Sequence, residues 1–146
     1  MTFQRFTYLG FFFLACAFFV FAAAEILKHP PAAKEGSETI VRIGGSELRV
    51  EIVTSASAWI KGLSGRESLP AESGMLFAFA EPGYYSFWMK DTRFPIDIVW
   101  IDESKKVIDI AYGVRPESYP ERFRPRLPAQ YVLEVNRGWA DEQGVE

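Results

Sequence analysis

The chain has 146 residues, with 16 Lys and Arg against 19 Asp and Glu, a net charge of −3, and 49% hydrophobic residues. One globular domain fits this length and composition, whereas two domains or a disordered chain do not. The only cysteine, Cys16, lies in an apolar leading segment, and the only histidine, His29, lies beside two prolines. These positions exclude a disulfide scaffold, a cysteine nucleophile, a Ser/His/Asp triad and a multi-histidine metal site. We therefore expect neither a metal nor a cofactor.

Residues 1–24 have the layout of an export signal. Arg5 precedes 19 uncharged positions, and the stretch ends in three alanines ahead of Glu25. Small residues at its end fit a signal peptide cleaved before Glu25. Two alternatives stay open: an uncleaved membrane anchor, because the run approaches the roughly 20 residues that span a bilayer, and lipidation at Cys16. Each interpretation predicts that the rest of the chain is exported, periplasmic or anchored to the inner membrane facing outward.

Residues 25–38 are predicted to form a linker and residues 39–146 a single domain. The linker is rich in Pro and charged residues and has no apolar period. Short β-rich runs then predict a mainly β fold: a small β-sandwich or flattened barrel of about seven short strands with one or two short helices. The expected strands are Thr39–Ile43, Glu47–Val53, Met75–Ala80, Tyr84–Asp91, Pro95–Asp102, Lys106–Tyr112 and Gln130–Asn136, and the expected helix is Ser55–Leu63.

Residues 113–129 form a long connection with four prolines and four arginines against two glutamates. Connections of this length are uncommon in a compact domain unless they cover something. One interpretation is a loop that closes one end of the fold by burying Tyr119, Phe123 and Leu127. The other is a basic lid over a site for an anionic ligand.

The stretch from Phe87 to Trp100 is the segment most suited to binding chemistry. If residues 87–92 pair with residues 95–100 around a turn, Lys90 faces Asp97. Trp88 then lies on the same face, and an indole beside a cation and a carboxylate can grip a small polar ligand. The alternative is a cross-strand ion pair that Trp88 shields from water.

A set of short strings marks a known family. They are, in chain order, Gly62-Leu63, Arg66, Leu69-Pro70, Gly74-Met75-Leu76-Phe77, Phe87-Trp88-Met89-Lys90, Thr92, Pro95, Asp97 and Leu133-Glu134. Together they resemble the signature of the domain of unknown function 192 (DUF192) family over roughly residues 48–145. The resemblance implies a small, mainly β domain, here an exported envelope member, and leaves the biochemical activity open.

The resemblance also implies the candidate ligand-binding residues. These are Arg66, Trp88, Lys90, Asp97 and Glu134, with Gly62 and Gly74 as backbone positions. Glu134 lies in an otherwise apolar run and needs a cationic partner if it points inward, for which Arg66 and Lys90 are the natural choices. The structural alternative is an Arg66–Glu134 bridge that fastens the helix end to the sheet.

The sequence departs from the family pattern in three places. Ser64 stands where Met is usual, and Asp91 stands where Asn is usual. Ionised Asp only accepts hydrogen bonds, so a carbonyl or anion that Asn would hold is repelled here. Family members also commonly continue with a Gly-Asp turn and a final strand beyond the point where this chain stops.

Three functions compete, and the sequence favours them in the order given. The first is a non-catalytic envelope module that binds a small polar or anionic ligand on the face of Trp88, Lys90 and Asp97. The second is a membrane-associated interaction or accessory domain that recognises an envelope protein through Tyr84, Tyr85 and Trp139. The third is a hydrolase or lyase with Asp97 and Glu134 as its acid and base.

Two further expectations concern partners. We expect no nucleic acid, because the exported part is net acidic and its basic cluster is diluted by glutamates. We expect membrane contact only through residues 1–24, if that segment is not cleaved.

Overall fold

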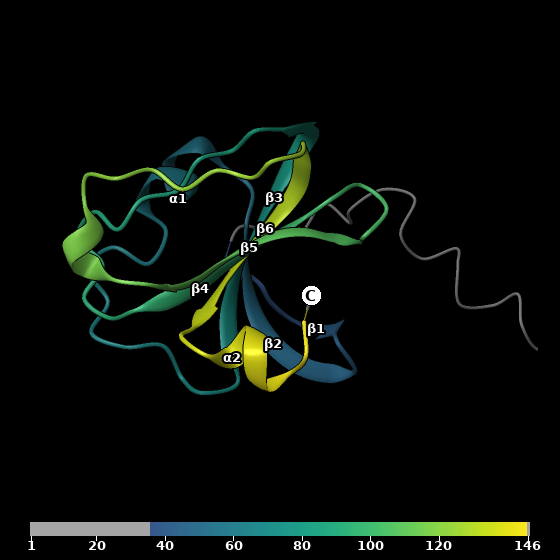
Figure 1. Cartoon of the computed structure of the whole chain (residues 1–146), viewed down its shortest axis with the longest axis horizontal. Helices are drawn as coiled ribbons and strands as arrows, with labels where there is room; N and C mark the ends of the chain where they lie inside the picture. Colours follow the sequence, from purple (N-terminus) through teal and green to yellow (C-terminus); the bar gives the residue numbers. More distant parts are fainter. Residues whose placement is uncertain (1–35, 146) are drawn as a thin grey trace, which may run out of the picture. The chain divides into compact units, whose positions relative to one another are not determined.

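The computed structural model describes residues 36–145, which hold six strands and two short α-helices (Figure 1). The elements are β1 (Glu38–Ile43), β2 (Ser46–Val53), α1 (Ala56–Lys61), β3 (Ser73–Gly83), β4 (Ile96–Ile101), β5 (Val107–Val114), the 3₁₀ turn η1 (Pro116–Ser118), β6 (Ala129–Asn136) and α2 (Trp139–Glu142). This confirms the expected mainly β domain with short helices, with six strands in residues 36–145 instead of about seven, because residues 84–91 make only an isolated bridge at Phe87. The predicted export signal lies outside the described residues.

All six strands belong to one mixed sheet with the order β1-β2-β3-β6-β4-β5. Each neighbouring pair is antiparallel except β2 and β3, which run parallel and are connected along the chain by a segment that contains α1. Gly44 and Gly45 make the tight turn between β1 and β2 with φ angles of 60° and 89°, which residues with a Cβ rarely adopt. The sequence-predicted hairpin at residues 39–53 is therefore confirmed.

The sheet is apolar on both faces. Side chains alternate along the strands, so that Phe77 and Ile98 belong to one cluster, while Val99 and Leu133 belong to the other. The first cluster also packs against Trp59 of α1 and Phe123 of the long loop, and the second contains Trp139 of α2. In Figure 1, α1 and α2 accordingly lie on opposite sides of the sheet. We refer to these sides as the α1 face and the α2 face.

The predicted pairing of residues 87–92 with residues 95–100 is wrong. β4 is a central strand whose two edges pair with β5 and β6, so no edge is left for residues 87–92. That segment instead makes a single antiparallel bridge between Phe87 and Phe123, then turns at Met89–Thr92. Asp91 adopts a φ of 55° in this turn. β4 is apolar along nearly its whole length, which is typical of a buried central strand. The predicted pairing instead assumed that its side chains alternate between a buried and an exposed face, as in an edge hairpin.

Within residues 36–145 no helix is long and apolar enough to cross a membrane. The same residues contain no group of three or more His, Cys, Asp or Glu side chains arranged to hold a metal ion.

Candidate functional site

Asp97 lies on the α2 face and is fully buried at 0% exposure. Its Oδ1 accepts a hydrogen bond from the backbone N–H of Gly113 at 2.7 Å. Its Oδ2 accepts from the N–H groups of Gly138 and Ala140 at 2.9 and 3.2 Å. Three backbone donors satisfy a buried carboxylate, so Asp97 joins β4, β5 and α2 instead of facing a ligand. The structure does not bring Asp97 together with Trp88 and Lys90.

Glu134 lies on the α1 face of β6, between Met75 of β3 and Ile98 of β4. It is 5% exposed, and among the described residues its Oε2 has no hydrogen-bond partner. Burial disfavours the charged form and raises the pKa of Glu134 from 4.5 to about 8, although the positive charge of Arg66 acts in the opposite direction. Glu134 is therefore mainly a neutral carboxylic acid at pH 7.

Arg66 is bound to Glu51, not to Glu134. One guanidinium nitrogen lies 2.6 Å from Oε2 of Glu51, and both side chains are partly exposed. The expected Arg66–Glu134 bridge is not formed, and Arg66 acts on Glu134 only through its charge. Because Asp97 and Glu134 point to opposite faces of the sheet, they also cannot work as an acid and base pair on one substrate.

The bridge between Phe87 and Phe123 organises the remaining candidates. Each residue donates its N–H to the carbonyl of the other, at 2.7 and 2.8 Å. Both rings pack against the core of the α1 face. In an antiparallel bridge the residue after Phe87 lies opposite the residue before Phe123, which places Trp88 opposite Arg122. The sequence alternation then turns both of these side chains away from the core.

Trp88 is the centre of an aromatic and basic surface. The guanidinium carbon of Arg122 lies 4.2 Å from the centre of the indole ring, and Nζ of Lys90 lies 6.0 Å from it. The ring of Tyr119 meets the indole edge to face, with centroids 5.9 Å apart. Such distances are typical of cation–π and aromatic contacts. We call the group of Trp88, Lys90, Tyr119 and Arg122 the Trp88 surface.

The charges of the Trp88 surface are not neutralised by ion pairs. Lys90 and Arg122 are exposed, and neither forms a salt bridge with any other residue of the 36–145 range. By contrast, Arg126 at the end of the same loop is paired with Asp109 of β5. Among the described residues, the two cations beside the indole thus have no carboxylate partner.

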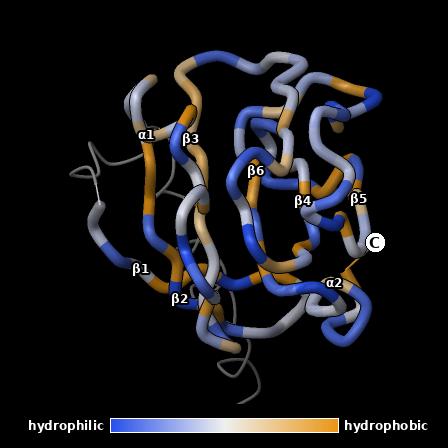
Figure 2. Tube along the Cα trace, turned by 90° about the vertical axis from the view of Figure 1, so that its left-hand side faces the viewer, coloured by the Kyte–Doolittle hydropathy of each residue, from blue (hydrophilic) through white to orange (hydrophobic). Residues whose placement is uncertain are grey.

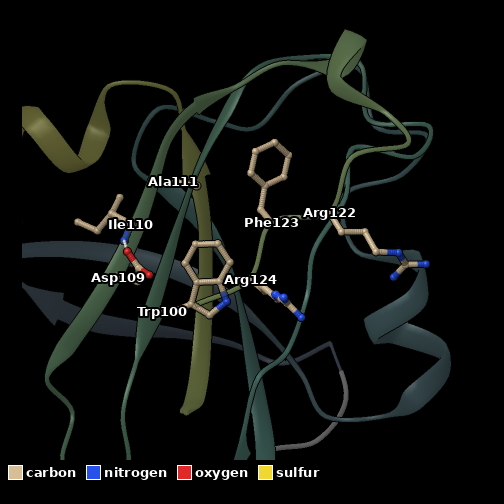
Figure 3. Close-up of a pocket in the computed structure, with 7 residues that line it drawn as sticks. All are labelled: Trp100, Asp109, Ile110, Ala111, Arg122, Phe123 and Arg124. Atoms are coloured by element: carbon tan, nitrogen blue, oxygen red, sulfur yellow. Dashed lines mark hydrogen bonds between the residues drawn. The ribbon is translucent and has the colours of Figure 1, made fainter. Parts of the chain in front are cut away.

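A shallow hollow of about 250 Å³ lies beside this surface, between β5 and residues 122–124. Trp100 and Phe123 contribute its apolar side, while Arg122 extends away from it toward the outside (Figure 3). Asp109 borders the hollow. Burial opposes its ionisation, but hydrogen bonds and the charge of Arg126 outweigh that effect and lower the pKa of Asp109.

The long loop confirms the interpretation of a loop that closes the fold only in part. Phe123 packs into the core as expected of a loop that closes the fold, whereas Tyr119 and Leu127 are exposed. Lys90 lies near Trp88, although the hairpin from which the sequence reasoning grouped them is not formed, and that reasoning missed the contacts of Trp88 with Tyr119 and Arg122. No local pattern in the sequence links Phe87-Trp88 with Arg122-Phe123, because the bridge joins segments far apart along the chain.

The residues proposed for a protein-binding patch are dispersed. Tyr84 is exposed, but Tyr85 stacks on Phe79 with ring centroids 3.5 Å apart. Trp139 is buried in the cluster on the α2 face. These three side chains do not form one exposed surface.

Comparisons with known proteins agree with this fold. The chain is similar over 75% of its length to a protein of unknown function from Novosphingobium aromaticivorans, with 30% identity, a TM-score of 0.68 and 78% of that chain covered. It is also similar to a protein from Sinorhizobium meliloti described as a candidate transcription regulator. That match has 31% identity and a TM-score of 0.67, and it covers 73% of this chain and 84% of that one. No curated protein matches the chain.

A family model described as "Uncharacterized ACR" matches residues 39–146, which is the whole predicted domain. The strings around Gly74, Trp88 and Glu134 that carry the resemblance all fall inside this match. The chain therefore belongs to the DUF192 family.

Proposed function

We propose that this protein is an exported, non-catalytic module that binds a small anionic ligand on the Trp88 surface. The observation that carries the proposal is the position of Arg122 and Lys90 beside the indole of Trp88, at 4.2 and 6.0 Å from the ring centre. Export is supported by the pattern of residues 1–24, a charged start followed by a long apolar run.

The chemistry of the surface selects the ligand class. A guanidinium and an ammonium attract a carboxylate or phosphate, and the guanidinium can hold it through two parallel hydrogen bonds. The indole offers a flat apolar area for a ring that carries the anion. A sugar acid has both parts, an anionic group and a ring with an apolar face, and we take it as the ligand class.

The positions of Asp97 and Glu134, the carboxylates expected to act as acid and base in a hydrolase, favour binding over catalysis. Asp97 is held by three backbone N–H groups on the α2 face. Glu134 is buried on the α1 face among apolar side chains. A role in DNA binding, taken from the description of the Sinorhizobium protein, is disfavoured by the net charge of −3.

The test is a titration of the full chain in mild detergent with D-glucuronate, with glucose and inorganic phosphate as comparison ligands. The indole N–H signal of Trp88, assigned by its loss in Trp88→Phe, is followed by NMR. We expect a saturable shift with glucuronate, a weaker one with phosphate and none with glucose. Arg122→Gln is expected to weaken glucuronate binding about tenfold, the effect of losing one charge-assisted contact.

Arg137→Gln is the matched control, because Arg137 is exposed, follows β6 and, like Arg122, forms no ion pair within residues 36–145. Equal loss of binding in Arg137→Gln and Arg122→Gln would indicate a general charge effect and contradict the proposed site. An unchanged Trp88 signal with every anion would contradict the function itself.

A further inference from the structure

β1 is the outermost strand of the described sheet and pairs with β2 on one side only (Figure 2). Ile52 donates its backbone N–H to the carbonyl of Ser37 at 3.0 Å, and the pairing of the two strands continues to the turn at Gly44-Gly45. In an antiparallel pair every second residue bonds to the partner strand. Thr39, Val41 and Ile43 therefore bond to β2, which leaves the N–H and C=O groups of the alternate residues pointing outward.

The outward-pointing residues are Glu38, Ile40 and Arg42, and their order is self-complementary. If a second β1 lies antiparallel to the first with Ile40 opposite Ile40, then Glu38 of each copy faces Arg42 of the other. Ile40 is 60% exposed, which is unusual for an isoleucine in a sheet. Glu38 and Arg42 are exposed as well.

We propose that two copies of this chain associate through β1, antiparallel and centred on Ile40, so that one continuous sheet runs through both. The pairing buries the exposed Ile40 side chains against each other and satisfies the outward backbone groups of both edges. It places two Glu38–Arg42 contacts symmetrically about a twofold axis, as an isologous dimer requires.

The charges next to β1 extend this complementarity. Arg42 bonds Glu47 across the hairpin at 2.9 Å from Nε, and Arg49 lies 3.8 Å from Glu38. All four side chains project from the α1 face of the hairpin, because residues that oppose each other in a sheet share a face. In the pair of copies, Arg42 would thus lie between Glu47 of its own chain and Glu38 of the other.

The other outer strand of the described sheet, β5, carries a contact with the long loop. Arg126 fastens the long loop beside β5 by donating its backbone N–H to Asp109 at 2.9 Å and by a salt bridge to the same carboxylate. An antiparallel pairing of β1 with β1 of a second copy uses the free edge of each chain once, so it closes as a dimer instead of growing into a fibre.

The first test is disulfide formation in the full chain. Cys16→Ala removes the only cysteine of the sequence, and Ile40→Cys places one back at the proposed axis. Directly opposed residues in a hydrogen-bonded pair have Cα atoms about 5.5 Å apart, which suits a disulfide. Ile60→Cys in the same background is the matched control, because Ile60 lies on α1 and is 73% exposed. We expect Ile40→Cys to cross-link at least tenfold faster than Ile60→Cys.

The second test reads the register from charge. Glu38→Lys and Arg42→Glu are made in separate chains that also carry the two cysteine changes and tags of different mass. Pairs of identical variants place like charges opposite each other, whereas a mixed pair places opposite charges together at both positions. The yield of the mixed dimer is squared and then divided by the yields of the two dimers of identical chains multiplied together. This ratio cancels effects confined to one chain. We expect this ratio to be at least tenfold above its statistical value.

Either of two results would overturn the inference. The first is cross-linking through Ile40→Cys that is no faster than through Ile60→Cys. The second is a mixed-pair ratio at its statistical value, because pairing through residues 1–24 or by collision is insensitive to the facing charges at Glu38 and Arg42.

Discussion

Asp97 accepts a hydrogen bond from the backbone N–H of Gly138 at 2.9 Å, which ties the start of α2 to the central strand β4. Gly138 is the N-terminal capping residue of α2 and has a φ of 86°, so the chain reverses sharply at this point. The other carboxylate oxygen holds Gly113, a second residue with positive φ at 57°. One buried side chain thus fixes the turn after β6 and the irregularity near the end of β5.

Asp97→Asn is expected to destabilise the domain without weakening anion binding. The amide nitrogen of Asn donates hydrogen bonds and would face backbone N–H groups in place of one carboxylate oxygen. We expect a loss of about 2–4 kcal/mol in the free energy of unfolding, as for a buried charged acceptor left with unpaired donors. Urea denaturation measures the loss, and the glucuronate titration in native buffer measures binding. A loss of affinity with unchanged stability would instead assign Asp97 to the site.

The raised pKa of Glu134 predicts that the stability of the domain depends on pH. Its pKa is about 8 in the folded chain against 4.5 as the ordinary value, so the folded state binds the proton more tightly. The contribution of Glu134 to the free energy of unfolding is greatest below pH 4.5 and is lost as the pH rises through about 8. Within this window the free energy of unfolding should fall by at most about 1.4 kcal/mol per pH unit from this group. Urea denaturation at several pH values between 5 and 9 measures the slope.

Glu134→Gln is the control for that slope. Gln keeps the shape of the neutral acid but does not titrate, so its curve of stability against pH should lack the fall. If the wild type and Glu134→Gln show parallel curves, other groups produce the pH dependence and Glu134 titrates near its ordinary value.

The sequence predicts the hairpin at Gly44-Gly45 and the buried character of Leu48, Val50 and Ile52 because both depend on local chemistry. It places Trp88 with Asp97 wrongly because that step assumes which strands are neighbours. β4 pairs with β6, and the paired residues are 30 to 40 positions apart in the chain. The partnership of Trp88 with Arg122 depends on the same kind of distant pairing, through Phe87 and Phe123, and no local pattern specifies it.

Gly74 is closely packed, so a side chain at this position is expected to destabilise the domain. A Cβ at this position would lie 3.0 Å from the carbonyl oxygen of Glu134 and from methyl groups of Leu48 and Leu133. Gly74→Ala should therefore cost roughly 1–3 kcal/mol through overpacking. Gly65→Ala separates packing from backbone strain: a Cβ there meets no described atom within 4 Å, but the φ of 78° favours glycine. It should cost about 1 kcal/mol. Thermal unfolding compares the two variants, and a smaller loss in Gly74→Ala would contradict the packing argument.

Asp91→Asn is expected to strengthen anion binding while leaving stability nearly unchanged. Asp91 is exposed, directly follows Lys90, and has a φ of 55° that Asn adopts as readily as Asp. Replacing it removes a negative charge beside the Trp88 surface, so glucuronate affinity should rise about two- to fivefold at low ionic strength, and the gain should shrink as added salt screens the charge. Glu103→Gln is the matched control, because Glu103 is an exposed carboxylate in the turn between β4 and β5. An equal gain in Glu103→Gln would mean that the anion responds to net charge alone and not to the surface formed by Trp88, Lys90 and Arg122.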